Sequence, residues 1–145
     1  MRVSIASDHA GFEGKQMIAE HLRQRGVEVI DRGPDSDDRV DYPDFAVLVA
    51  RDVAEGAAER GVLVCGTGIG MAIAANKVAG VRAANVIDPE FAQLCRDHND
   101  ANVITLSGRF VSDDDNRAIV DAFLDTPFGG GRHAGRVQKI GALDR

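Results

Sequence analysis

Short apolar runs alternate along the chain with stretches in which apolar residues recur every third or fourth position. The short runs are typical of buried strands, and they cover Val3–Ala6, Val27–Ile30, Val62–Cys65, Val81–Ile87 and Val103–Leu106. The stretches between them predict helices. These run from Phe12 to Arg25, from Pro43 to a stop at Gly61, and over about 69–78, 89–98, 112–124 and 132–143.

Strands that alternate with helices indicate parallel βαβ units, so we predict an α/β fold whose parallel sheet is covered on both faces. The length of 145 residues fits a single domain over 1–145. Ligands of such folds bind beyond the carboxyl ends of the strands. Polar and glycine-rich turns follow three of the runs directly, and we expect them to meet at one rim of the sheet: Asp8-His9, Cys65–Gly70 and Ser107-Gly108-Arg109.

Composition narrows the class of protein only a little. A net charge of −6 argues against a general surface for nucleic acid or anionic membranes, while leaving room for a local basic site. No apolar run approaches the roughly 20 residues of a membrane-spanning helix, and the first residues lack the apolar core of a signal peptide. The two cysteines do not suggest a disulfide framework. We therefore expect a cytoplasmic protein.

The stretch CGTGIGM places three glycines where a strand passes into a helix. A dinucleotide-binding motif does not fit, because Met71 stands where its third glycine belongs, and a P-loop does not fit, because Lys77 lies too far along. A tight turn with close helix packing is one explanation. Backbone amides at a helix start also bind negative charge, which can be a phosphate or an oxyanion formed during a reaction.

Cys65 stands beside this turn. By residue type alone a cysteine in an apolar run is a small buried hydrophobe. The adjacent helix start favours a thiolate, so this position also suits a base or a nucleophile. Cys95 has no such neighbours and is assigned to helix packing, and His21 is assigned to the surface.

Two other histidines and three arginines are candidate ligand contacts. His9 lies in a strand-end loop, and His98 with Asn99 ends a helix, although a polar turn and a helix cap explain them equally well. Arg132 and Arg136 are four residues apart on one predicted helical face, which suits a phosphate or a solvated surface. Another arginine, Arg109, ends a strand. Together these residues favour a phosphorylated metabolite as ligand.

The segments SDHAGF, DYPD, CGTGIGMAIAANK, HNDANV and GGRHAGRV resemble, in order and over nearly the whole chain, the type B ribose-5-phosphate isomerases. That family also contains galactose-6-phosphate and allose-6-phosphate isomerases. The resemblance implies a three-layer α/β/α sandwich on a five-stranded, Rossmann-like parallel sheet, with the C-terminal helix contributing to the dimer site. It also implies an enzyme of the pentose phosphate pathway that needs no metal or organic cofactor. Its active sites would be shared between the subunits of a homodimer, sometimes within a tetramer.

The resemblance also implies roles for individual residues. Cys65 would be the base that moves a proton between C1 and C2 of the open-chain sugar, and His98 would open the furanose ring with help from Asp8 or Thr67. Asn99 and Arg109 would reach into the partner's site. The enediolate would be stabilised by the amides of Gly66, Thr67, Gly68, Ile69 and Gly70, and the phosphate would be held by His9, Arg109, Arg132 and Arg136.

The chain departs from the family's pattern in the turn after the fifth strand, where Ser107 stands in place of an expected glycine, and at Asp88-Pro89-Glu90. Two other functions stay open at this point. One is isomerisation of a different aldose phosphate, such as galactose 6-phosphate, allose 6-phosphate or a tetrose phosphate. The other is a phosphate-binding module without turnover.

Overall fold

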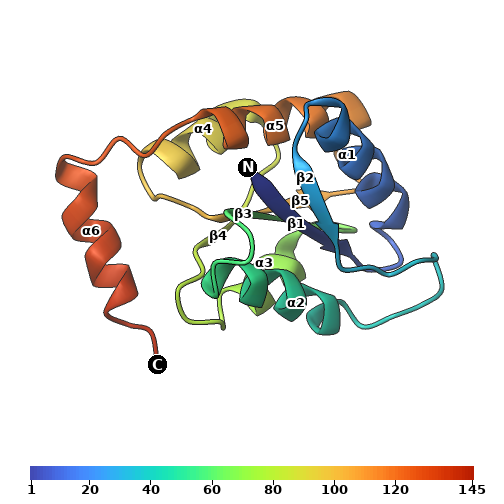
Figure 1. Ribbon diagram of the computed structural model, residues 1–145, viewed down its shortest axis with the longest axis horizontal. Helices are drawn as coiled ribbons and strands as arrows, with labels where there is room; N and C mark the ends of the chain where they lie inside the picture. The colour runs from blue at the N-terminus through green and yellow to red at the C-terminus, as the bar shows by residue number, and fades with distance from the viewer.

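A computed structural model describes residues 1–145 and contains one five-stranded sheet in which all strands are parallel, in the order β2-β1-β3-β5-β4 (Figure 1). The strands are β1 (Arg2–Ser7), β2 (Glu28–Asp31), β3 (Arg60–Cys65), β4 (Ala83–Asn85) and β5 (Val103–Ser107). The predicted α/β class and parallel sheet are confirmed.

Helices cover both faces of the sheet. Helices α1 (Phe12–Gln24), α4 (Pro89–Asp97) and α5 (Asp113–Asp125) lie on one face, and α2 (Tyr42–Ala54) and α3 (Ile69–Ala75) lie on the other (Figure 1). Side chains alternate across a strand, so β3 contributes Val62 and Val64 to the apolar cluster under the first group of helices. Leu63 and Cys65 join the cluster under α2 and α3. The three layers are therefore those expected.

Two elements differ most from the predicted ranges. The fourth strand is shorter than Val81–Ile87 because it lies at the sheet edge and pairs only with β5, and because the Arg82 amide donates to the Asn102 side chain. The second helix ends at Ala54, well before Gly61, because Gly56 with φ 79° provides the left-handed turn that commonly ends a helix.

The last helix, α6 (Arg132–Gly141), lies at the end of the molecule away from β2 and has no buried residue (Figure 1). Its approach is fixed by the Gly129 amide, which donates to the Asp97 carbonyl at the end of α4 at 3.0 Å. After the helix, the Asp144 carboxylate accepts from the Gly80 amide at 2.8 Å. None of the helices has the length and apolar character needed to cross a bilayer.

Candidate active site

The three polar turns do meet at one rim. The loops after β1, β3 and β5 surround a cavity of about 480 Å³, which residues of α2 and α3 also border. Its lining comprises Asp8, His9, Ala10, Tyr42, Cys65, Gly66, Thr67, Ile69, Gly70, Ile73 and Arg109. Cys65 and Ser107 are the last residues of β3 and β5 and pair with each other in the sheet register. This pairing brings the glycine turn next to the Arg109 turn.

The glycine turn can adopt its conformation only because glycine has no side chain. Gly68 begins α3 with φ 85°, and a Cβ there would lie 2.4 Å from Asn85 Oδ1 and 3.1 Å from the Leu106 carbonyl oxygen. A Cβ on Gly70 would lie 2.6 Å from the ring of Tyr42. The backbone thus approaches the neighbouring strand and Tyr42 more closely than any L side chain allows.

Cys65 directs its sulfur to the start of α3. The Gly68 amide donates to Cys65 Sγ at 3.0 Å, and the residue is 6% exposed, at the wall of the cavity. An amide donor and a helix N-terminus both stabilise a thiolate. Cys95 differs, because burial raises the pKa of its thiol to about 11 and its Sγ donates to the Ala92 carbonyl. The assignment of Cys95 to packing is confirmed.

The five amides of residues 66–70 divide into two groups. The Gly68 amide donates to Cys65 Sγ, and the Ile69 amide donates to Thr67 Oγ1 at 3.1 Å. The amides of Gly66, Thr67 and Gly70 donate to no acceptor within the protein. These three residues line the cavity, so their amides are free to bind an anion there.

Asp8 and His9 are held by backbone contacts. Asp8 is 8% exposed, and its Oδ1 accepts from the Gly11 amide at 2.9 Å. His9 Nδ1 accepts from the Val40 amide at 3.2 Å, so in the neutral ring Nε2 carries the proton and can act as a donor. Arg109 lies against Gly66, where a Cβ would come within 3.3 Å of its guanidinium. The cavity thus contains a thiol, a carboxylate, an imidazole and one guanidinium.

The other predicted residues form a second cluster. His98 and Asn99 follow α4, which runs antiparallel to the strands and therefore ends near the opposite rim of the sheet from Cys65. The His98 and His133 rings stack with their centroids 4.3 Å apart. Loss of hydration, with the nearby His98 and Arg132, lowers the pKa of His133. Arg136 also contributes to the positive field there.

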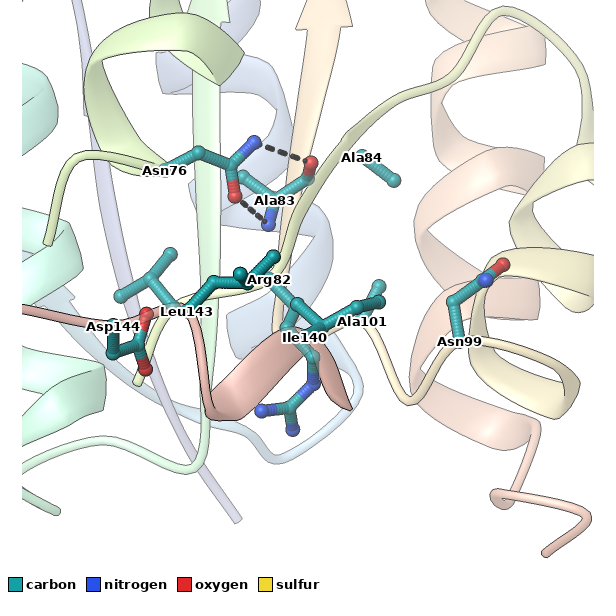
Figure 2. A pocket seen from close by; sticks show the side chains of 10 residues that line it. Asn76, Arg82, Ala83, Ala84, Asn99, Ala101, Ile140, Leu143 and Asp144 are labelled. Atoms are coloured by element: carbon teal, nitrogen blue, oxygen red, sulfur yellow. Dashed lines mark hydrogen bonds between the residues drawn. The ribbon is translucent and has the colours of Figure 1, made fainter. Parts of the chain in front are cut away.

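None of the residues of this second cluster lines the Cys65 cavity. Asn99 instead lines a separate cavity of about 470 Å³, whose other walls include Ile140 and Leu143 of the C-terminal segment. Figure 2 shows Asn99 at one side of this cavity and the C-terminal residues at the other. Within one chain the predicted site residues therefore form two groups.

Sequence reasoning missed two residues of interest. Tyr42 lines the Cys65 cavity and packs over Gly70, and the available signal was its place in DYPD, one of the segments that carry the family resemblance. The second is His133, whose ring stacks on His98. His21 was assigned to the surface, but it is partly buried and its Nε2 lies 2.8 Å from Asp121 Oδ1. No group of three or more His, Cys, Asp or Glu side chains is arranged to hold a metal ion.

Comparisons with known proteins match nearly the whole chain. The model of the Ribose/Galactose Isomerase family matches residues 3–140. The ribose-5-phosphate isomerase B of Escherichia coli is 47% identical over 144 residues, which is 99% of this chain and 97% of that protein. A probable ribose-5-phosphate isomerase B from Mycoplasma pneumoniae is 49% identical and covers 99% of this chain and 95% of its own length.

Solved structures show the same likeness. Ribose-5-phosphate isomerase B from Clostridium thermocellum superposes with a TM-score of 0.97 at 49% identity, covering 99% of this chain and 97% of that one. The Mycoplasma genitalium enzyme, solved with bound ribulose-5-phosphate, gives a TM-score of 0.94 at 49% identity, covering 97% of this chain and 94% of that one.

Proposed function

The chain belongs to the ribose/galactose isomerase family, and from this premise we propose that it interconverts ribose 5-phosphate and ribulose 5-phosphate. The observation that carries the proposal is the position of Cys65. Its sulfur lies at the edge of a cavity that also contains free amides and the Arg109 guanidinium. A base next to donors for a developing oxyanion is what proton transfer beside a carbonyl requires.

The chemical step follows from this arrangement. The Cys65 thiolate takes the proton from C2 of the open-chain aldose, the C–H electron pair forms the C1–C2 double bond, and the carbonyl pair moves to O1. The free amides of Gly66 and Thr67 stabilise this enediolate. Transfer of the O2 proton to O1 and return of the thiol proton to C1 give the ketose and restore the thiolate.

The substrate phosphate would be held away from the reacting carbons. Arg109 and the Nε2 donor of His9 line the cavity in this chain. Arg132 and Arg136 lie in the second cluster and would act on the same phosphate only from another copy of the chain. Anchoring at the far end of the sugar orients C1 and C2 toward the thiol.

A second copy would complete the site, as the family resemblance implies for a homodimer. In one chain His98 and the Arg132–Arg136 pair lie outside the Cys65 cavity, so neither ring opening nor full phosphate binding can occur there. Several large apolar side chains are exposed in the single chain, and a second copy would cover some of them: Ile69, Ile73, Ile87, Phe91, Phe110 and Leu143.

In the assembled site His98 of the second copy would donate the proton that opens the furanose ring, with Asn99 beside it. Asp8 and the Thr67 hydroxyl lie in the cavity and would assist. Thr67 Oγ1 accepts from the Ile69 amide, so its own proton is free to be donated to the sugar. The two free thiols fit the cytoplasmic location expected from the sequence.

The proposal is tested by incubating the purified protein with aldose phosphates of four, five and six carbons, without added metal or cofactor. We expect the highest kcat/KM with ribose 5-phosphate. A higher kcat/KM with galactose 6-phosphate, allose 6-phosphate or a tetrose phosphate would identify that sugar as the substrate instead. Binding of all these sugars without turnover would indicate a phosphate-binding module.

The shared site has its own test. Cys65→Ala and His98→Ala chains, each inactive alone, are mixed and allowed to exchange subunits. If sites combine residues from two chains, each hybrid dimer contains one intact site, and activity returns. If activity does not return although light scattering and mass labels show hybrid dimers, the shared site is excluded.

A further inference from the structure

The Ser107 hydroxyl links the two turns of the cavity. Its Oγ donates to the Gly66 carbonyl at 2.7 Å and accepts from the Phe110 amide at 3.0 Å. The residue is 1% exposed, so water does not compete for these bonds. The Ser107 carbonyl in turn accepts from Asn116 Nδ2 of α5 at 3.0 Å, which fixes the backbone that carries the hydroxyl.

This link determines the orientation of one peptide group in the glycine turn. The Gly66–Thr67 peptide is planar and trans, so its carbonyl and its N–H point in opposite directions. With the Gly66 carbonyl directed to Ser107 on β5, the Thr67 N–H points away from β5. That amide is one of three in the turn that have no acceptor in the protein, and Thr67 lines the cavity.

Without the hydroxyl the peptide would be held less firmly. The Gly66 carbonyl would keep a single partner, the Arg109 amide at 3.2 Å, and the Phe110 amide would lose its acceptor. Gly66 precedes Thr67 and Gly68 follows it. The backbone therefore offers little resistance to rotation of the Gly66–Thr67 peptide. A glycine at position 107, which the family's pattern led us to expect, could not form the link.

We propose that Ser107 is a positioning residue for the isomerisation. Its hydroxyl holds the Gly66–Thr67 peptide so that the Thr67 amide meets the enediolate oxygen. This inference rests on the proposed function, because it concerns the oxyanion that forms in that reaction. Ser107 itself does not contact the substrate.

The test compares Ser107→Ala with Ser112→Ala. The control also loses a serine hydroxyl that accepts from a backbone amide, because Ser112 caps α5 by accepting from Asp115 at 3.1 Å, but it makes no contact with the glycine turn. Removing an oxyanion donor outright lowers kcat by two to three orders of magnitude, so loosening one should lower it by about tenfold. We expect this loss of kcat, with KM little changed, in Ser107→Ala alone.

Ligand affinity separates positioning from general damage. A hydroxamate that mimics the enediolate and carries the same phosphate should bind Ser107→Ala about tenfold more weakly, while the inhibition constant of inorganic phosphate should not change. Ser107→Cys retains a weak donor of similar size and should recover part of kcat. It also provides the comparison if the alanine variant does not fold.

The outcomes are distinguishable. An active wild type with unchanged kcat in Ser107→Ala would overturn the role of Ser107 and leave the proposed function intact. Equal losses of kcat in Ser107→Ala and Ser112→Ala, or equal weakening of the hydroxamate and of phosphate, would also overturn it. A wild type that isomerises no sugar phosphate would overturn the proposed function, and the role of Ser107 with it.

Discussion

Substitution of Gly68 by alanine tests how closely the glycine turn is packed. The residue has φ 85°, where an L side chain costs about 1–2 kcal/mol. The new Cβ would also lie 2.4 Å from Asn85 Oδ1 and 3.1 Å from the Leu106 carbonyl. The carbonyl belongs to β5 and cannot move away, so overpacking adds about 1–3 kcal/mol. We expect a total destabilisation of about 2–5 kcal/mol, and a loss of activity because the Gly68 amide is displaced from Cys65 Sγ.

The matched control is Gly26→Ala. Gly26 has a similar φ of 80°, but a Cβ there would meet nothing within 4 Å. This variant carries only the backbone strain, about 1–2 kcal/mol, and should keep full activity. Urea unfolding of both variants gives the difference, which measures the crowding at Gly68 alone. Equal destabilisation of the two variants, or full activity in Gly68→Ala, would refute the close approach of the turn to β5.

Three further predictions concern other charged and thiol groups. Iodoacetamide at about pH 8 should label Cys65 before Cys95. The pKa of Cys95 is about 11, so only about one Cys95 side chain in a thousand is a thiolate at that pH. Comparable labelling of Cys95 in the folded protein would contradict this prediction. Burial alone would raise the pKa of Asp52, but hydrogen bonds from Arg32 and Ser4 lower this pKa below 3.8. Ionised Asp52 therefore stabilises the fold above pH 3.8, and this stabilisation is lost as the pH falls through the folded-state pKa. Asp52→Asn should therefore destabilise the protein at neutral pH and progressively less in acid, and a pH-independent difference would argue against the ion pair. Arg132→Ala and Arg136→Ala should each raise KM about tenfold through loss of a charge-assisted hydrogen bond, whereas a selective loss of kcat would exclude phosphate anchoring.

The rim of the sheet could be predicted from sequence because it follows from connectivity. Each of the turns at Asp8-His9, Cys65–Gly70 and Arg109 comes directly after a strand, and parallel strands place their carboxyl ends at one edge. The boundaries of β4 were less predictable. Val81 and Val86 are buried as a strand pattern requires, yet only Ala83–Asn85 pair with β5 in the sheet register, because burial and strand pairing are separate properties.

Residues brought together by tertiary packing gave no local signal. His21 contacts Asp121, which lies 100 positions along the chain, and His133 reaches His98 only because the segment before α6 is bound to the end of α4. The division of the site into two groups also has no local signature. It depends on the direction of α4, which carries His98 to the rim opposite Cys65.

The most direct measurement is the rate of ribose 5-phosphate isomerisation by Cys65→Ala, together with its affinity for the same sugar phosphate. If the sulfur beside Gly68 is the base, turnover falls to background while the substrate still binds with near wild-type affinity. If the variant exchanges the C2 proton with solvent at the wild-type rate, another group performs the proton transfer and Cys65 is not the base.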